Sequence, residues 1–239
     1  FEDPYGKTFK NRKRHSPESV KLAKTIADES TVLLKNENQL LPLDAKSLKS
    51  IAIIGPNADQ VQFGDYTWSR NNKDGVTPLQ GIKNRVNKNT AIHYAKGCSL
   101  TSLDTSGIAE AVEAAKNSEV AVIFGGSASA ALARDYKSST CGEGFDLNDL
   151  NLTGAQSQLI REVYRTGTPV ILVLVTGKPF VIEWEKNNLP AILVQWYAGE
   201  QAGNSIADIL FGEVVPSGRL TFSFPRSTGH LPVYYNYLP

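Results

Sequence analysis

The sequence contains little sulfur and little histidine. In 239 residues it has no methionine, two cysteines (Cys98 and Cys141) and three histidines. The spacing of these residues matches no metal-binding motif, and we therefore expect no metal site. The two cysteines are compatible with a disulfide or with two free thiols. Because methionine is absent, Phe1 is not a translation start, and we expect the chain to be a piece of a longer protein.

The sequence also lacks an excess of charge and a long apolar run. Its 25 basic and 24 acidic residues leave a formal net charge of +1. Such a balance argues against nucleic acid or an anionic membrane surface as the partner. The basic cluster at residues 7–14 is interpreted as a solvated linker. The sequence shows neither a signal-peptide pattern nor an apolar run long enough to span a bilayer.

A regular alternation of helix-like and strand-like segments dominates the sequence. Ser16 and Pro17 open an amphipathic helix whose apolar positions continue to Leu34. Further helices are predicted at residues 76–86, 106–117, 153–165, 180–186 and 203–211. Strands are predicted at residues 51–55, 91–94, 119–124, 169–175, 191–196 and, as an edge strand, 219–224. We therefore expect an α/β fold, a three-layer sandwich with a mostly parallel sheet of about six strands and helices on both faces.

Loops that follow the predicted strands are expected to meet at the carboxyl edge of the sheet. They span residues 55–72, 125–149 and 176–179, where ligands of parallel α/β folds bind. The second loop contains Glu143 between two glycines, in the run Cys141-Gly142-Glu143-Gly144-Phe145-Asp146. A carboxylate on a flexible loop above a rigid scaffold suits catalysis, so Glu143 is the candidate catalytic residue. The alternative is an ordinary solvated glutamate.

The loop at residues 55–72 is rich in aromatic side chains. It contains Tyr66 and Trp68, in the run Phe63-Gly64-Asp65-Tyr66-Thr67-Trp68. Aromatic faces beside a carboxylate suit sugar rings, whose C–H faces are apolar and whose rims are polar. Tyr66 and Trp68 are therefore candidate substrate-binding residues. The alternative is that both rings pack the loop against its own domain.

Other catalytic patterns are weak or absent. Gly55-Pro56-Asn57-Ala58 follows a strand but lacks both phosphate-binding glycine patterns, so we expect a tight turn there and no cofactor. The nucleophile elbow of serine hydrolases does not occur, and the histidines lie far apart in the sequence. Glu200 is predicted in the first turn of a helix, where a negative charge complements the helix dipole.

Several motifs, in order along the chain, resemble the second domain of glycoside hydrolase family 3. They are Ser30-Thr31-Val32-Leu33-Leu34-Lys35-Asn36, Ile53-Ile54-Gly55-Pro56-Asn57-Ala58, the Glu143 run, Trp196-Tyr197-Ala198-Gly199-Glu200-Gln201-Ala202-Gly203 and Pro216-Ser217-Gly218-Arg219-Leu220. The resemblance runs from about Ser16 to the last residue, and the ordered set is far more specific than any single motif. Members of this family are retaining β-glucosidases, β-xylosidases and related exo-acting enzymes.

The resemblance implies an active site divided between two domains. A (β/α)8-type barrel supplies an aspartate nucleophile, and the α/β sandwich supplies the general acid/base at the position that matches Glu143. A family aromatic near the leaving-group subsite matches Tyr66. The implied partners are a β-glucoside or β-xyloside oligosaccharide and the barrel of the same protein, and the implied location is periplasmic or secreted. The rival interpretation is a non-catalytic α/β carbohydrate-binding or interaction module that kept the fold.

The resemblance also implies a domain division. Residues 1–15 are assigned to an interdomain linker and residues 16–239 to the α/β sandwich, without the barrel and the usual carboxy-terminal region. Leu147 stands where family members often carry arginine, so an ion pair of those relatives is not expected here. Because the chemistry needs two carboxyl groups and this chain supplies one, we expect the isolated chain to hydrolyse nothing.

Overall fold

The computed structural model describes residues 15–67, 69, 72–129, 140–142, 144 and 146–234. Its centre is a six-stranded sheet with the strand order β1-β6-β5-β4-β2-β3. The strands are β1 (Val32–Asn36), β2 (Ser50–Ile54), β3 (Ala91–Ala95), β4 (Val120–Gly126), β5 (Val170–Val175) and β6 (Ala191–Gln195). Strands β2 to β6 pair in parallel, and β1 pairs antiparallel with β6. The predicted mostly parallel sheet is confirmed.

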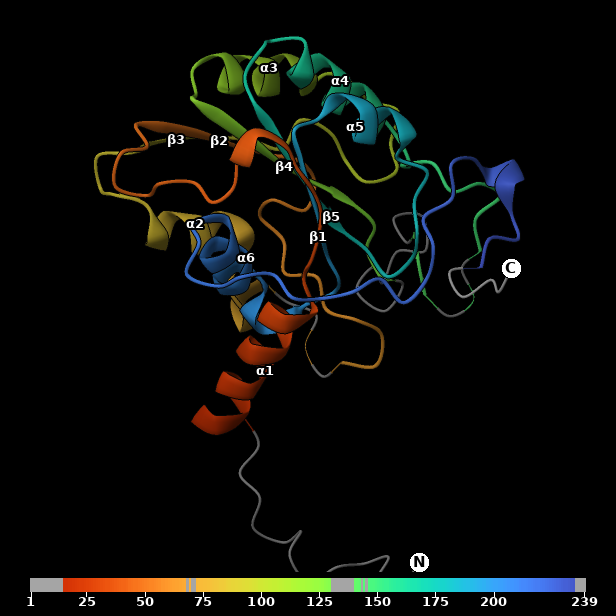
Figure 1. Cartoon of the computed structure of the whole chain (residues 1–239), viewed down its shortest axis with the longest axis horizontal. Helices are drawn as coiled ribbons and strands as arrows, with labels where there is room; N and C mark the ends of the chain where they lie inside the picture. Colours follow the sequence, from red (N-terminus) through yellow and green to blue (C-terminus); the bar gives the residue numbers. More distant parts are fainter. Residues whose placement is uncertain are drawn as a thin grey trace, which may run out of the picture.

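Helices cover both faces of this sheet. In the described residues they are α1 (Pro17–Ser30), α2 (Pro78–Arg85), α3 (Ile108–Lys116), α4 (Gln156–Tyr164), α5 (Glu183–Asn188) and α6 (Ala202–Leu210). Figure 1 shows α3, α4 and α5 on one side of the sheet and α2 and α6 on the other. The three-layer sandwich predicted from the alternating pattern is therefore confirmed. No helix in the described part of the chain is both long and apolar enough to cross a membrane.

The central strands are buried on both faces. Along β5, alternate side chains enter two separate core clusters, one on each side of the sheet: Val170, Leu172 and Leu174 in the first, and Ile171, Val173 and Val175 in the second. All six are buried. This arrangement explains why the run at residues 169–175 is apolar at nearly every position.

The first strand was not predicted. The apolar residues Val32 to Leu34 were expected to extend the first helix, but α1 ends at Ser30 and they begin β1 instead. Thr31 ends the helix in an extended conformation, and its hydroxyl donates a hydrogen bond to Ala27 O at 2.9 Å. The β-branched Thr31 and Val32 favour this change to a strand. The apolar residues Val32 to Leu34 fit helical spacing, but hydrogen bonding to β6 makes them a strand.

The edge strand predicted at residues 219–224 is wrong. That segment is irregular, and β1 occupies the sheet edge beside β6. The apolar side chains of residues 219–224 pack on the domain without forming a strand. Leu220 and Phe224 lie against the core, and the Phe222 ring meets the Trp196 ring edge-on at a centroid distance of 5.5 Å. The period-two pattern thus reflects packing of an irregular segment on the domain.

Helix ends follow local capping groups. Ser16 Oγ accepts a hydrogen bond from Ser19 N at 3.3 Å, and Pro17 opens α1 as predicted. Pro78 lies in the first turn of α2, also as predicted, with Thr77 as the capping residue. Helix α5 begins three residues later than expected, because the fully buried Phe180 belongs to the extended segment that precedes it.

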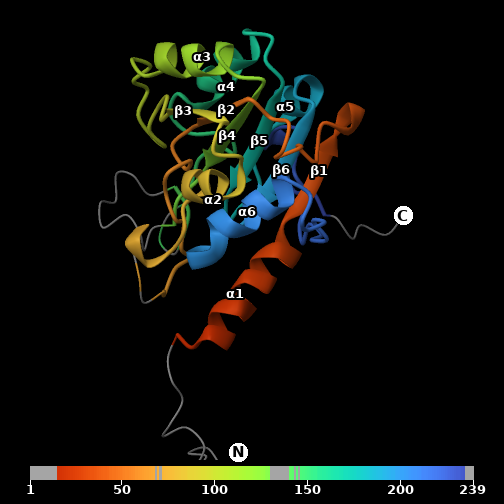
Figure 2. The ribbon, with the colours of Figure 1, turned by 90° about the vertical axis from the view of Figure 1, so that its left-hand side faces the viewer.

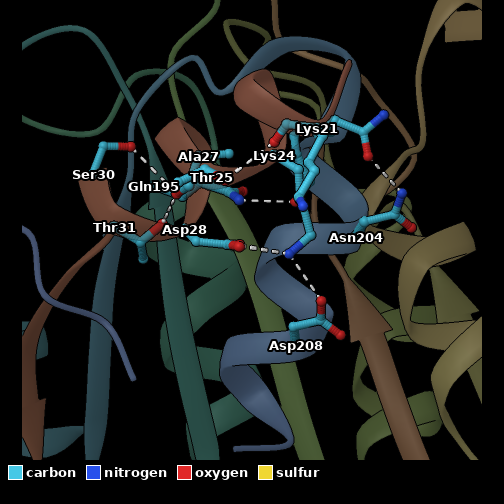
Figure 3. A network of polar contacts seen from close by, with 12 residues as sticks. Lys21, Lys24, Thr25, Ala27, Asp28, Ser30, Thr31, Gln195, Asn204 and Asp208 are labelled. Carbon is cyan, nitrogen blue, oxygen red and sulfur yellow. Dashed lines mark hydrogen bonds and ion pairs between the residues drawn. The ribbon is translucent and has the colours of Figure 1, made fainter. Parts of the chain in front are cut away.

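Helix α1 is fastened to α6 by a cluster of ion pairs (Figure 3). Lys24 Nζ lies 2.7 Å from Asp28 Oδ1 in the same helix and 2.9 Å from Asp208 Oδ2 in α6. Burial acts to lower the pKa of Lys24, but the two carboxylates outweigh it and raise the pKa above its ordinary value. The beginning of α1 projects beyond the rest of the domain (Figure 2).

Candidate functional site

The candidate site lies where the loops after the parallel strands begin. Parallel strands have their carboxyl ends at one edge, so the residues after Ile54, Gly126, Val175 and Gln195 start at that edge. Of the predicted site residues, Tyr66 is described by the structure. Glu143 and Trp68 lie outside the described residues, and their roles stay predictions.

Tyr66 is presented to solvent on a tight loop. Its side chain is 82% exposed, so this ring does not pack its loop against the domain. Its φ is +62°, in the left-handed region that non-glycine residues seldom adopt. Thr67 Oγ1 lies 3.1 Å from Gly64 O and 2.9 Å from Ser69 O, and sharing its one hydrogen between these two carbonyls closes the turn around Tyr66. An unfavourable backbone that exposes an aromatic ring is typical of a functional position.

The glycines on either side of Glu143 adopt backbone conformations that suit glycine. The φ angles are +123° at Gly142 and +79° at Gly144. An added Cβ at Gly144 would meet no atom within 4 Å, so the requirement there is conformational rather than steric. The chain therefore turns on both sides of position 143, which no other pair of residues would allow as readily.

The two ends of the segment at residues 130–139 are joined beside the end of β4. Thr140 Oγ1 accepts a hydrogen bond from Ala128 N at 3.0 Å, and Thr140 N donates to Ala128 O at 3.3 Å. Ser129 and Cys141 form an isolated parallel β-bridge. We call residues 127–129 and 140–142 the stem. The stem returns the chain to the sheet edge immediately before position 143.

The aromatic loop is tied to this stem. Ser129 Oγ donates a hydrogen bond to Asp65 Oδ1, next to Tyr66 in sequence. Asn57 adds a second connection deeper in the domain, because its side-chain nitrogen donates to Gly125 O at 3.3 Å and Ser127 O at 3.2 Å. Gln62 holds Asn57 in turn, through a 2.7 Å hydrogen bond to Asn57 Oδ1. The structure thus brings together the loops that carry Tyr66 and Glu143, as predicted from strand order.

Sequence reasoning did not single out Tyr197, which lies just beyond β6. Its hydroxyl lies 2.7 Å from Ser127 Oγ in the stem, and Ser127 Oγ donates to Thr176 Oγ1 at 3.1 Å. Burial raises the pKa of Tyr197 far above its ordinary value. No sequence motif marks Tyr197 as a residue of the site, and only its position directly after a parallel strand could have drawn attention to it.

Lys178 was also missed. Within the described part of the chain, its buried Nζ has no hydrogen-bond partner and lies 4.9 Å from the centre of the Phe180 ring. Burial lowers the pKa of Lys178, and the nearby Cys141 and Asp149 partly offset that effect. Lys178 therefore places a weakly solvated positive charge close to Cys141 of the stem.

Glu200 was predicted in the first turn of a helix, but the first turn of α6 contains no acidic residue. Glu200 lies in a 3-10 turn, Gly199–Gln201, directly before α6 rather than in the helix itself. Its carboxylate lies 2.6 Å from His15 Nε2, and its carbonyl accepts a hydrogen bond from Val76 N at 2.8 Å. Glu200 therefore joins the segment before α1 to the segment before α2.

The two cysteines are free thiols in this structure. Cys98 is buried, with 7% of its surface exposed, and Cys141 is half-buried in the stem. The question left open by the sequence is thereby answered. Among the residues that the structure describes, no three histidine, cysteine, aspartate or glutamate side chains converge as metal ligands would.

The chain is similar in sequence to part of several curated β-glycosidases. A β-xylosidase of Formosa agariphila is 42% identical over 224 residues, covering 91% of this chain and 30% of that protein. A periplasmic β-glucosidase of Salmonella typhimurium is 39% identical over 242 residues, with the same two coverages of 91% and 30%. The chain therefore spans about 30% of the length of these curated relatives.

Solved structures agree in fold and in extent. A β-glucosidase from Listeria innocua, in complex with isofagomine, superposes with a TM-score of 0.83 at 32% identity and covers 99% of this chain and 32% of its own. A β-glucosidase from Erythrobacter marinus gives 0.81 at 34% identity, with coverages of 92% and 32%. Residues 31–239 also match the description "Glycosyl hydrolase family 3 C-terminal domain". The chain therefore belongs to glycosyl hydrolase family 3, of which it is a C-terminal domain.

Proposed function

We propose that this domain supplies Glu143 as the general acid/base of an exo-acting retaining β-glycosidase. The observation that carries the proposal is the junction of two loops at the carboxyl edge of the sheet. Ser129 of the stem donates a hydrogen bond to Asp65, the neighbour of Tyr66 in sequence. The loop that carries the exposed Tyr66 ring therefore adjoins the stem that leads to Glu143. A carboxyl group and an aromatic platform on adjoining loops are what a glycosidase needs around a leaving-group sugar.

The chemistry requires a second carboxylate from elsewhere in the full-length protein. A retaining glycosidase places two carboxyl groups about 5–5.5 Å apart, one as nucleophile and one as acid and then base. In this proposal Glu143 first gives its proton to the leaving oxygen and then takes a proton from the attacking water. The nucleophile belongs to the barrel domain, so the two domains meet around the substrate.

The proposed substrates are terminal β-linked glucose or xylose residues. Relatives with the names β-xylosidase and β-glucosidase both match at about 40% identity, so both sugars belong to the proposal. Tyr66 and Trp68 are assigned to the leaving-group side. In the proposed division, residues 1–15 are a linker and residues 16–239 form the sandwich domain. Since the chain holds one of the two carboxyl groups, the isolated domain is inactive.

Leaving-group dependence in the full-length protein tests the acid role. In Glu143→Ala, kcat/KM falls about 100-fold or more for a disaccharide, because the leaving oxygen then departs without a proton. It changes far less for a dinitrophenyl glycoside, whose leaving group needs no proton. Asp146→Ala, a carboxylate of the same loop, is the matched control. Equal losses on both substrates, or no loss, would show that Glu143 is not the acid.

The rival function is a carbohydrate-binding module without chemistry. It predicts that the isolated domain binds a β-linked disaccharide and that Glu143→Ala leaves turnover by the full-length protein unchanged. Measurable hydrolysis of an aryl β-glycoside by the purified domain would contradict both accounts, since it would require a complete site within this chain.

A further inference from the structure

A line of hydroxyl groups joins the loops that follow β4, β5 and β6. Thr176 Oγ1 donates a hydrogen bond to Lys178 O at 2.8 Å, and Ser127 Oγ donates to Thr176 Oγ1 at 3.1 Å. Each hydroxyl has one hydrogen to give. Because Ser127 gives its hydrogen to Thr176, the 2.7 Å contact between Ser127 Oγ and the Tyr197 hydroxyl has Tyr197 as the donor. The line therefore runs in one direction, from Tyr197 to the backbone after β5.

The Tyr197 oxygen faces the stem. Its hydrogen is directed to Ser127 Oγ in the stem, and its ring lies beside the Cys141 side chain over Gly177. Gly177 provides the space for that approach. A Cβ at Gly177 would lie 2.9 Å from Tyr197 Cε2 and 3.1 Å from Cys141 Sγ. Ring and thiol thus pack together on the bare Cα of Gly177.

Cys141 is the point at which this cluster reaches the candidate catalytic loop. Its backbone pairs with Ser129 in the stem, and it precedes Glu143 by two residues. Burial keeps the pKa of Tyr197 far above its ordinary value, so the hydroxyl retains its hydrogen at neutral pH. The hydrogen bond from Tyr197 to Ser127 of the stem is therefore kept at neutral pH.

We propose that Tyr197 is a positioning residue for the acid/base loop, because its hydroxyl bonds Ser127 of the stem and its ring packs beside Cys141, which holds the backbone leading into Glu143 at the ends of β4 and β5. The inference rests on the proposed role of Glu143. A general acid must reach hydrogen-bonding distance of the leaving oxygen, and a misplacement of about 1 Å can cost about 100-fold in rate. Removing the hydroxyl loosens one attachment of several, and the expected cost is about tenfold.

The test is Tyr197→Phe in the full-length protein, which removes one oxygen and keeps the ring on Gly177. kcat/KM falls about tenfold for a disaccharide and less than twofold for a dinitrophenyl glycoside, since only the first substrate needs the acid. Tyr164→Phe is the matched control: Tyr164 lies on α4, and its ring contact with Trp184 survives loss of the hydroxyl. An equal fall on both substrates, or a change in melting temperature alone, would overturn the proposal.

Two serine variants cover the case in which Tyr197→Phe folds poorly. Ser127→Ala removes the oxygen that accepts the Tyr197 hydrogen bond and reproduces the selective loss on the disaccharide, whereas Ser118→Ala, which removes a hydroxyl bonded to Ala114 O at 2.8 Å away from the site, stays within about twofold of wild type. If both variants behave alike, the inference fails.

A second comparison separates this inference from the proposed function. In a Glu143→Ala background, Tyr197→Phe causes no further selective loss on the disaccharide. If Glu143→Ala is selective and Tyr197→Phe is not, the positioning role alone is wrong. If Glu143→Ala is not selective, the proposed function is wrong.

Discussion

Ser129 donates a hydrogen bond to Asp65 across 64 residues of sequence. Asp65 belongs to the loop after β2, and Ser129 to the stem after β4. These strands are direct neighbours in the sheet, so the contact joins adjacent loops at their bases. The exposed Tyr66 and the backbone that leads to position 143 are consequently held relative to each other.

Ser129→Ala removes this connection while leaving both loops otherwise intact. A hydrogen bond to a carboxylate is worth roughly 1.5–3 kcal/mol, and about 1.4 kcal/mol corresponds to tenfold in rate. We expect kcat/KM for a disaccharide to fall about tenfold in the full-length protein. Ser106→Ala is the control, because Ser106 Oγ donates to Asp104 Oδ2 at 3.0 Å on an exposed turn elsewhere. Equal effects of the two variants would mean that the connection does not serve the site.

The aromatic face of Tyr66, rather than its hydroxyl, is expected to contact the leaving-group sugar. Tyr66→Ala should lower kcat/KM for a disaccharide by about fivefold to tenfold, since stacking contributes on the order of 1 kcal/mol. Tyr66→Phe should stay within about twofold of wild type. Leu103→Ala, which also truncates an apolar side chain with 81% exposure, serves as the control. A larger loss in Tyr66→Phe than in Leu103→Ala would identify the hydroxyl as the important group.

Close helix packing behind the site predicts a large stability effect at Gly203. A Cβ there would lie 2.1 Å from Thr77 O, where α6 crosses the start of α2. Gly203→Ala should lower the free energy of unfolding by about 3 kcal/mol, although alanine favours helix by about 1 kcal/mol. Gly229→Ala, with its nearest neighbour at 3.9 Å, should change stability little. Thermal unfolding of the two full-length variants measures the difference in stability between them. Equal melting temperatures would contradict the close contact between α6 and the start of α2.

Cys98 should respond to pH unlike an ordinary thiol. Burial raises its pKa from 9.0 to about 11, with the Lys96 charge acting weakly in the opposite direction. Because the thiolate is the reactive form, alkylation of Cys98 by iodoacetamide should keep rising with pH through about 11. For the same reason, the neutral thiol's contribution to stability is complete below pH 9 and lost as pH rises through about 11.

Peptide mass spectrometry can follow that alkylation site by site. At pH 8, Cys98 in the native protein should carry about 100-fold less thiolate than the same residue after denaturation, and should react correspondingly more slowly. The denatured protein is therefore its own control. A native rate that levels off near pH 9 would contradict the buried environment of Cys98.

Fold class was predictable because the strongest signal was burial on both faces. A strand that is apolar at nearly every position, such as residues 169–175, is typical of a parallel sheet covered on both faces. The parallel pairing of β2 to β6 was therefore predictable. The sequence misled where tertiary pairing decided the outcome. Val32 to Leu34 fit a helical stripe and became β1, because an open edge of β6 was available to pair with it. Residues 219–224 alternated like a strand but had no strand to pair with.

The site was predictable at the level of loops and not of contacts. Strand order placed the Tyr66 and Glu143 loops at one edge, and glycines on either side of Glu143 indicated unusual backbone turns, which φ angles at Gly142 and Gly144 confirm. Tyr197, Ser127 and Lys178 could not be found, since their roles depend on distances between loops far apart in sequence. Hydroxyl and ammonium groups acquire such roles only when burial removes water.

In the proposed function Glu143 gives and then takes the proton during hydrolysis, and every other proposed role depends on this one. The most direct test of this role is the product that full-length Glu143→Ala forms from a dinitrophenyl β-glycoside in the presence of azide. A retaining enzyme holds its sugar as an α-linked intermediate, so azide that replaces the unactivated water must attack from the β face. We predict faster turnover with azide and a β-glycosyl azide by NMR. An α-glycosyl azide would assign Glu143 as the nucleophile, and wild-type turnover without azide incorporation would remove it from catalysis.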